Sequence, residues 1–385
     1  MSKAARTLVI CSKSTWHPRI RREHALARLA ARADHRVVFV ERPTDVRALS
    51  QRQALPWVQG FRGLRPSAVE DGVEVVPRST FVPGHRGGLA GRSEQFLLSA
   101  TLARFTPASA VVVTTLPWQW AAARRLSGAR HVYDCADDWA AMTPARKDAF
   151  LRCYREIAAE ADMVVAASER LAELFPDARA LTVVRNGTPF ELLDPPEQKA
   201  EPATLVYLGT LSERFDSALV TAVLRNLGPE WSIDLYGQCQ YAGLQERPAD
   251  ELLAMIEGFG DRVRWHGLIS RSQAASAIDR AAVAVIPFRR IGAVTGGDAM
   301  KLYDYAARGR PIVSTSWTSD LSAFGPPHLY EAEGAEAFTA AVRAAATEPP
   351  GHALARRSWA EAQRWEARWP AWEKALFGMG DRWKS

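Results

Sequence analysis

The sequence predicts an α/β protein made of two Rossmann-like, doubly wound domains that face each other across a cleft. Three observations predict this fold. Short apolar runs alternate with amphipathic stretches along most of the chain. The alternation restarts after a proline-rich break near residue 195. The chain has 385 residues, of which 47% are hydrophobic, so it can bury the cores of two domains.

The first domain is expected over residues 1–190. Its strands are predicted at six apolar runs: Leu8–Cys11, His35–Val40, Ala110–Thr114, His131–Ala136, Met163–Ala167 and Leu181–Val184. Helical patterns separate them, beginning with His17–Ala33. Apolar strands joined by helical crossovers are typical of a parallel sheet covered on both faces. Between Pro43 and Gly91 the pattern weakens, and we expect part of this stretch to be a long functional loop or a surface helix.

A linker is expected over residues 191–203, and a second domain over residues 204–355. Its predicted strands are Leu205–Leu208, Ser232–Tyr236, Val263–Trp265, Val283–Pro287 and Pro311–Ser314. The tail, residues 356–385, carries an apolar helical stripe interrupted by Pro370: Trp365, Trp369, Trp372 and Leu376. This stripe packs either on its own domain or back on the N-terminal domain.

Composition excludes several classes of protein. No apolar run approaches the roughly 20 residues that span a bilayer, and no signal-peptide pattern opens the chain, so a cytoplasmic protein is expected. The four cysteines lie far apart without a CxxC pair, which argues against a disulfide framework or a zinc site. Neither half has a GxGxxG after its first strand, which disfavours a dinucleotide-dependent dehydrogenase.

Charge is unevenly distributed along the chain. Residues 1–130 hold 21 basic and 8 acidic side chains, although the whole chain has a net charge of only +6. Such a field attracts nucleic acid, an anionic membrane surface or a phosphorylated ligand. The alternative is that these arginines lie on solvated faces.

A first candidate ligand site follows the first strand of the second domain. That strand ends at Gly209 and Thr210, and a helix begins after Asp216. Glycine lets the backbone approach a ligand, and the next helix N-terminus attracts phosphate. Arg214 adds a charge-assisted contact. A simple turn remains the alternative for this glycine.

The most distinctive stretch is Val283–Thr315. Its loop carries basic residues and a glycine pair: Arg289, Arg290, Gly296 and Gly297. A helix then opens with Met300 and Lys301, and Asp304 lies one turn later on the same face. The ammonium suits a diphosphate and the carboxylate suits ribose hydroxyls. The alternative is an intrahelical pair worth about 0.3 kcal/mol.

Five segments give the chain a family resemblance. They are MKLYDYAARGRPIVST at residues 300–315, YLGTLSERFD at 207–216, VRWHG at 263–267, VVRNGT at 183–188 and YDCADDW at 133–139. With them the chain resembles GT-B glycosyltransferases, which use two Rossmann domains to move sugar from a nucleotide diphosphate donor. It is most similar to bacterial glycan transferases of the teichuronic acid type and to the xanthan glucuronosyltransferase.

The resemblance implies roles for particular residues. Lys301 would contact donor phosphate, Asp304 the ribose, and the backbone around His266 and Gly267 the base. The last helix would cross back onto the N-terminal domain. Retaining members carry a glutamate eight positions before the residue matching Asp304, but here that position is Gly296. This departure favours an inverting relative.

Acceptor-side residues follow the strand in HVYDCADDW. Asp137 and Asp138 are candidates for the general base that inverting transfer requires, and helix N-capping is their alternative role. Strand alternation suggests that only one of these acids points inward. His17 is a second candidate base or sugar contact, with a structural role as its alternative. Arg21 and Arg22, with Arg19 beside them, are candidates to hold an anionic group.

These observations predict a glycosyltransferase that uses a nucleotide-sugar donor, most simply UDP-linked, and a hydroxylated acceptor. The acceptor is either a cell-surface glycan intermediate, lipid-linked in some cases, or a small metabolite. No cofactor and no metal are expected. A sugar-nucleotide epimerase and a retaining transferase remain alternatives, and a nucleic-acid binder ranks last. Arginines and aromatic residues at 47–65 add the hypothesis of peripheral contact with the inner face of a membrane.

Overall fold

The computed structural model describes residues 5–17, 21–45, 68–80, 88–189, 192, 194, 200–241, 247–289, 296–318 and 320–378. The chain divides into two compact units. The N-terminal unit comprises Met1–Arg185, Gly296–Asp298 and Arg368–Ser385, and the C-terminal unit comprises Asn186–Thr295 and Ala299–Ala367. Residues 47–65, on which the hypothesis of membrane contact depends, lie outside the described part.

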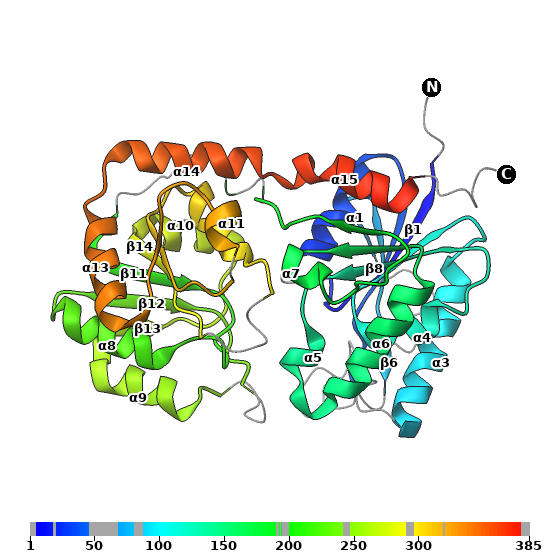
Figure 1. Ribbon diagram of the computed structural model, residues 1–385, viewed down its shortest axis with the longest axis horizontal. Helices are drawn as coiled ribbons and strands as arrows, with labels where there is room; N and C mark the ends of the chain where they lie inside the picture. Colours follow the sequence, from blue (N-terminus) through cyan, green and yellow to red (C-terminus); the bar gives the residue numbers. More distant parts are fainter. Residues whose placement is uncertain are drawn as a thin grey trace. The chain divides into compact units, whose positions relative to one another are not determined.

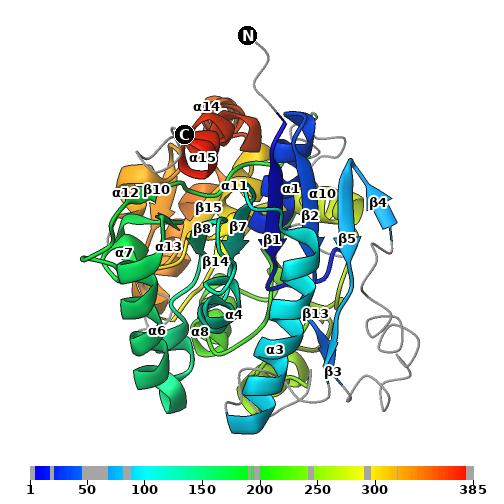
Figure 2. The same ribbon diagram turned by 90° about the vertical axis from the view of Figure 1, so that its right-hand side faces the viewer.

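The N-terminal unit is built on an eight-stranded sheet with the order β10-β9-β8-β7-β1-β2-β5-β4. Its strands are β1 (Thr7–Cys11), β2 (Arg36–Val40), β4 (Ala68–Glu70), β5 (Val73–Val76), β7 (Val111–Thr114), β8 (Arg130–Cys135), β9 (Met163–Ala166) and β10 (Leu181–Val183). The β4–β5 pair is antiparallel and the other pairs are parallel. Figure 2 shows β1, β2, β5 and β4 side by side. A separate pair joins β3 (Thr44–Asp45) to β6 (Ser79–Thr80).

Alternation along β1 explains why both faces of this sheet are covered. Leu8 and Ile10 belong to one apolar cluster, whereas Val9 and Cys11 belong to another on the opposite face. The helices of this unit are α1 (Arg22–Arg32), α3 (Gly88–Phe105), α4 (Trp120–Ala123), α5 (Trp139–Met142), α6 (Lys147–Glu160) and α7 (Glu169–Ala172). Helix α1 contributes to the first cluster, and α3 and α4 contribute to the second.

Residues 68–80, within the stretch where part of the chain was expected to be a loop or surface helix, contain strands that were not predicted. There β4 and β5 form a hairpin, and β5 extends the parallel sheet beside β2. Its turn is Asp71-Gly72, both with positive φ (52° and 78°). Asp-Gly between strands is a strong hairpin signal because its residues accept these angles. The sequence therefore contained this information, in the run VEDGVEVV.

The C-terminal unit has a six-stranded, wholly parallel sheet with the order β13-β12-β11-β14-β15-β16. Its strands are β11 (Glu201–Leu208), β12 (Ser232–Tyr236), β13 (Val263–Trp265), β14 (Ala281–Ile286), β15 (Ile312–Ser314) and β16 (Leu329–Glu331). Its helices are α8 (Ser217–Leu227), α9 (Asp250–Phe259), α10 (Arg271–Arg280), α11 (Met300–Ala307), α12 (Leu321–Phe324), α13 (Gly334–Ala346) and α14 (Pro350–Ala362). Figure 1 shows α8 and α9 on one side of these strands, and α10 and α11 on the other. Together with the first sheet, this confirms the two expected parallel α/β domains.

The tail does not leave the C-terminal unit until Arg368. Helix α14 stays with that unit because Trp359 stacks on Tyr303 with ring centroids 5.4 Å apart. In α15 (Trp365–Phe377), Trp372 and Leu376 are fully buried in the core of the N-terminal unit, on the face that α1 covers. The tail thus crosses back onto the first domain, later in the chain than the expected boundary at residue 356. Among the described residues, no helix combines the length and apolarity needed to cross a membrane.

Candidate functional site

Each sheet has one switch point, where the chain changes the direction in which it adds strands. In the C-terminal sheet this point lies between β11 and β14, because β12 and β13 follow on one side and β15 and β16 on the other. In the N-terminal sheet it lies between β1 and β7. Ligands of doubly wound sheets bind at the carboxyl ends of strands beside such points. The residues around these two points are therefore the candidate sites.

Three glycines follow the three adjacent strands β11, β12 and β13: Gly209, Gly237 and Gly267. All have positive φ, of 145°, 138° and 68°. A Cβ on Gly237 would lie 1.9 Å from the carbonyl oxygen of Gly209, so no side chain fits there. The Gly237 amide donates to the carbonyl of Gly267 at 2.7 Å. This gives an edge of bare backbone that a ligand can approach. Gly237 was not among the predicted site residues, although it directly follows a predicted strand.

Lys301, in the first turn of α11, points its ammonium at this edge. Its Nζ lies 3.7 Å from the ring centroid of Tyr207 and 4.5 Å from that of Phe288. A Cβ on Gly209 would lie only 2.8 Å from Nζ. Among the described residues no carboxylate lies within ion-pair distance of it. Burial and the neighbouring Arg214 therefore lower the pKa of Lys301 well below 10.5, although Asp304 partly opposes this.

The other residues predicted to bind the sugar donor differ in how many contacts they already make within the protein. Asp304 is half-buried on α11, one turn after Lys301, and Met300 begins that helix. Thr210 accepts a hydrogen bond from the Tyr207 hydroxyl through its carbonyl oxygen, at 3.0 Å. Arg289 forms ion pairs with Glu251 and Asp216. The charge of Arg214 is the one that lowers the pKa of Lys301 beyond the effect of burial.

His266 turns its imidazole toward strand β12. Its Nε2 lies 2.5 Å from Oδ1 of Asp234, and its ring stacks on Tyr236 at 4.5 Å. The backbone amide of His266 is also engaged, because it donates to the carbonyl of Leu235 at 3.0 Å. The nucleobase contact that the resemblance implies would therefore be made by the backbone around Gly267.

Gly296 and Gly297 belong, by their contacts, to the N-terminal unit. The Ser168 hydroxyl, at the start of α7, donates a hydrogen bond to the Gly296 carbonyl. A Cβ on Gly297 would meet nothing within 4 Å. Arg290 lies outside the described residues. The expected diphosphate loop is thus described only at its end.

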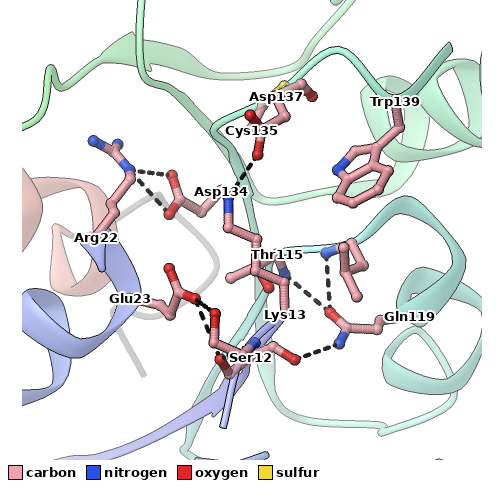
Figure 3. Close-up of polar contacts among 12 residues, drawn as sticks. Ser12, Lys13, Arg22, Glu23, Thr115, Gln119, Asp134, Cys135, Asp137 and Trp139 are labelled. Carbon is pink, nitrogen blue, oxygen red and sulfur yellow. Dashed lines mark hydrogen bonds and ion pairs between the residues drawn. The ribbon is translucent and has the colours of Figure 1, made fainter. Parts of the chain in front are cut away.

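At the other switch point, a polar network fills the edge between β1 and β7 (Figure 3). Lys13, two residues after β1, forms an ion pair of 2.6 Å with Asp137, which follows β8. Both side chains are largely buried, at 12% and 22% exposure. Although burial disfavours its charge, the carboxylates of Asp137 and Glu23 outweigh that effect and raise the pKa of Lys13 above 10.5.

The same network fixes the carboxylate of Glu23, on α1. Its Oε1 accepts hydrogen bonds from the hydroxyls of Ser14 (2.6 Å) and Ser12 (3.4 Å). Burial opposes ionisation, but Lys13 and His24 nearby lower the pKa of Glu23. The Gln119 amide donates to the Ser12 carbonyl and accepts from the backbone after β7 (Figure 3). Sequence reasoning missed Lys13 and Glu23, because no motif marks them.

Asp134 and Arg22 form a buried pair beside this network. The Arg22 Nε donates to both carboxylate oxygens of Asp134, at 2.9 and 3.0 Å, and the two side chains are 3% and 2% exposed. The Arg22 guanidinium also lies over Trp372 of α15, 4.8 Å from the ring centroid. The hypothesis that Arg22 holds a bound anion is therefore wrong. Its charge instead anchors the C-terminal helix to the N-terminal unit.

The structure separates the two candidate bases. Asp138 caps α5, because its Oδ1 accepts hydrogen bonds from the amides of Ala140 (3.0 Å) and Ala141 (3.1 Å). Asp137 lies at the edge of the sheet with Lys13. His17 is 70% exposed and pairs with Glu70 of β4 at 2.9 Å.

Within the described ranges, no group of three or more His, Cys, Asp or Glu residues has an arrangement that could hold a metal ion.

Comparisons with known proteins agree with this architecture. Residues 202–348 match the family model described as glycosyl transferases group 1. No curated protein sequence matches the chain. The sucrose-phosphate synthase of Thermosynechococcus elongatus is similar in structure, with a TM-score of 0.71 and 16% identity over 96% of this chain and 98% of the other.

Two further structures are similar. HepE from Anabaena, solved with UDP and glucose, has a TM-score of 0.69 and 13% identity over 98% of this chain and all of the other. TarM of S. aureus, solved with UDP and α-GlcNAc-glycerol, has a TM-score of 0.59 and 12% identity, and covers 74% of this chain and 59% of the other. The fold is thus the GT-B fold. The chain is a glycosyltransferase enzyme whose C-terminal unit carries a group 1 domain.

Proposed function

We propose that this enzyme moves a sugar from a nucleoside diphosphate donor, UDP-linked, to a hydroxyl of a glycan intermediate or small metabolite. The observation that carries the proposal is the Lys301 ammonium, which is held among aromatic rings at the strand-end glycines without a carboxylate partner among the described residues. Burial and the nearby Arg214 lower the pKa of Lys301, so the ligand-free protein disfavours its charged form. A diphosphate supplies the missing negative charge, and Arg214 adds to the field that attracts it.

In this proposal Asp304 binds the ribose hydroxyls, and the backbone amides beside Gly209 and Gly267 approach the nucleotide. Glycine at these positions lets the ligand reach main-chain donors. The positive side chains stabilise the leaving diphosphate directly, so we propose that the reaction requires no metal ion and no cofactor. UDP as the nucleotide has support from the neighbour HepE, which was solved with it.

For the chemical step we propose Asp137 as the general base. The acceptor oxygen bonds to the anomeric carbon of the donor sugar, while the bond from that carbon to the diphosphate breaks and its electron pair leaves with the diphosphate. The hydroxyl proton passes to the Asp137 carboxylate. One displacement inverts the anomeric configuration. Inversion also fits Gly296, which stands where retaining relatives have an acid.

A nucleotide screen tests the donor proposal. UDP, TDP, GDP and ADP are each added to the protein, and the melting temperature is followed. One nucleotide should stabilise the protein, by about 2.7 kcal/mol at one hundred times its Kd. Lys301→Met should lose this stabilisation, whereas Lys147→Met, a control at the start of α6, should retain it. The donor site is wrong if no nucleotide stabilises the wild type, or if Lys301→Met binds equally well.

Product analysis separates the transferase from the epimerase alternative. The donor that the screen identifies is incubated with enzyme, with and without candidate acceptors, and the products are analysed by mass and NMR. Transfer releases nucleoside diphosphate and increases the mass of the acceptor by one sugar. Conversion of the donor into an isomer without any acceptor would instead support an epimerase.

A further inference from the structure

The C-terminal unit contains a cavity at the opposite edge of its sheet from Lys301. Its volume is about 580 Å³, within the range of small-molecule sites. Pro202, Ala282 and Pro311 line it from the amino-terminal ends of three adjacent strands, β11, β14 and β15. The donor residues lie at the carboxyl ends of these strands, so this cavity is separate from the proposed donor site.

Arginines surround this cavity in excess over acids. Two of them are paired within the fold: the Arg308 Nε donates to Asp279 at 2.8 Å, and the fully buried Arg356 binds Glu348. These pairs leave no net charge. Asp279 and Glu348 thus already have arginine partners, and neither forms an ion pair with the other arginines of the cavity.

Arg310 and Arg357 also line the cavity. Neither forms an ion pair with a carboxylate among the described residues. The Nη1 of Arg310 donates to the Ala281 carbonyl at 3.2 Å, but its Nε is buried without a hydrogen-bond partner. Burial lowers the pKa of Arg310, and Arg308 and Arg356 act in the same direction, although Asp279 and Glu348 partly oppose them. The cavity wall thus carries two arginines without a carboxylate partner among the described residues.

Two further features determine what this cavity would bind. The 13-residue helix α14 begins at its wall with Pro350, so the positive end of a helix dipole adds to the two guanidinium charges. Beside them the wall is apolar, formed by Ala345, Ala346 and Leu354, and Leu354 is 67% exposed. An exposed leucine beside these two arginines suits a ligand with a charged end and an apolar end.

We propose that this cavity is a second ligand site, which binds a phosphorylated small molecule through Arg310 and Arg357 and holds its apolar part against α13 and α14. A phosphate monoester carries close to two negative charges at neutral pH and accepts the forked donors of guanidinium groups. Its charge matches that of the two arginines, which have no carboxylate partner in the described part of the chain. The site does not depend on the identity of the sugar donor.

Calorimetric titration with phenyl phosphate tests the proposal, because this probe combines a dianion with an apolar ring. The protein carries Lys301→Met, so that the donor site does not contribute. We expect saturable binding with one molecule per chain, weaker binding of inorganic phosphate, and a decline in affinity with added salt. Arg357→Met should weaken binding at least tenfold, and Arg310→Met should do the same.

Controls keep the test decisive if a variant is unstable. Arg357 makes no hydrogen bond among the described residues, so its replacement should leave the melting temperature unchanged even if Arg310→Met lowers it. Arg225→Met, on α8 away from the cavity, should bind the probe like the parent protein. The proposal is overturned if phenyl phosphate does not bind saturably at about 10 mM, or if Arg357→Met binds it as tightly as the parent.

Discussion

Two partly buried lysines occupy comparable places in the two large sheets, yet their surroundings are opposite. Lys13 follows β1 beside the switch point of the N-terminal sheet, and Lys301 lies beside that of the C-terminal sheet. Asp137 and Glu23 raise the pKa of Lys13. Burial and Arg214 lower the pKa of Lys301.

The difference shows how one fold uses the same residue type for two purposes. The N-terminal edge satisfies its own charges, so Lys13 holds carboxylates in place without any ligand. At the C-terminal edge, Lys301 has no ion-pair partner among the described residues, which is costly for the free protein and useful when an anion binds. We therefore regard Lys13 as a positioning residue for Asp137, and Lys301 as a ligand-binding residue.

The largest expected effect is a difference in the free energy of unfolding between variants of Lys13 and of Lys301. Lys13→Met leaves Asp137 and Glu23 buried without their cation, so it should reduce the free energy of unfolding by about 3–5 kcal/mol. Lys301→Met removes a charge that the ligand-free protein compensates poorly, so it should change that free energy by about 1 kcal/mol at most, or increase it. Urea unfolding without nucleotide measures both. Equal losses in the two variants would contradict the comparison.

The next effect tests the base. Asp137→Asn should reduce turnover by on the order of 10² or more without changing nucleotide affinity, because the amide cannot accept the acceptor proton. Asp138→Asn is the matched control, since asparagine caps a helix as well as aspartate does. Its turnover should stay near that of the wild type. The measured quantity is the rate of nucleoside diphosphate release. Full activity of Asp137→Asn would exclude it as the base.

A third prediction uses pH. In the free protein the pKa of Lys301 is lowered from 10.5, and a bound diphosphate favours the charged form. Nucleotide binding therefore takes up a proton once the pH exceeds the free-state pKa. Affinity should be constant below that pKa and then fall by up to about tenfold per pH unit. Calorimetry at several pH values measures the nucleotide affinity. The nucleotide itself ionises in the same way with wild type and Lys301→Met, so the difference between their two pH profiles reports on Lys301. Identical pH profiles would contradict the prediction.

The smallest expected effect concerns the helix cap. Asp138→Ala removes the acceptor for the amides of Ala140 and Ala141, so it should cost about 1 kcal/mol of stability. Turnover per folded molecule should change little. Thermal unfolding compares it with Asp138→Asn, which should be nearly neutral. If the alanine variant loses turnover while remaining as stable as the asparagine variant, Asp138 has a chemical role.

Much of the fold could be predicted from the chain itself. Each of the eleven apolar runs overlaps an observed strand, because burial on both faces of a parallel sheet requires continuous apolar residues. The hairpin β4–β5 was not predicted, because its strands are short and Glu70 and Glu74 interrupt their apolar pattern. The edge strand β16 (Leu329–Glu331) was not predicted for a similar reason, because it has only three residues and one of its ends is exposed.

The candidate site was only partly predictable. Lys301 and Gly209 stand out because helix starts and strand ends have recognisable sequence patterns. Gly237 could have been found in the same way. Lys13 and Glu23 could not, since they lie ten residues apart and Lys13 meets Asp137 only when β1 and β8 enter the same sheet.

The sequence by itself determined the alternation of strands and helices, the break between two domains, and the helix that carries Lys301 and Asp304, because periodicity and glycine placement act locally. Only the tertiary structure decided which charges are paired. Arg22 meets Asp134, Lys13 meets Asp137, and Lys301 meets aromatic rings, although all three are basic residues beside apolar runs. Coulomb interactions depend on distance in space, and strand order sets that distance.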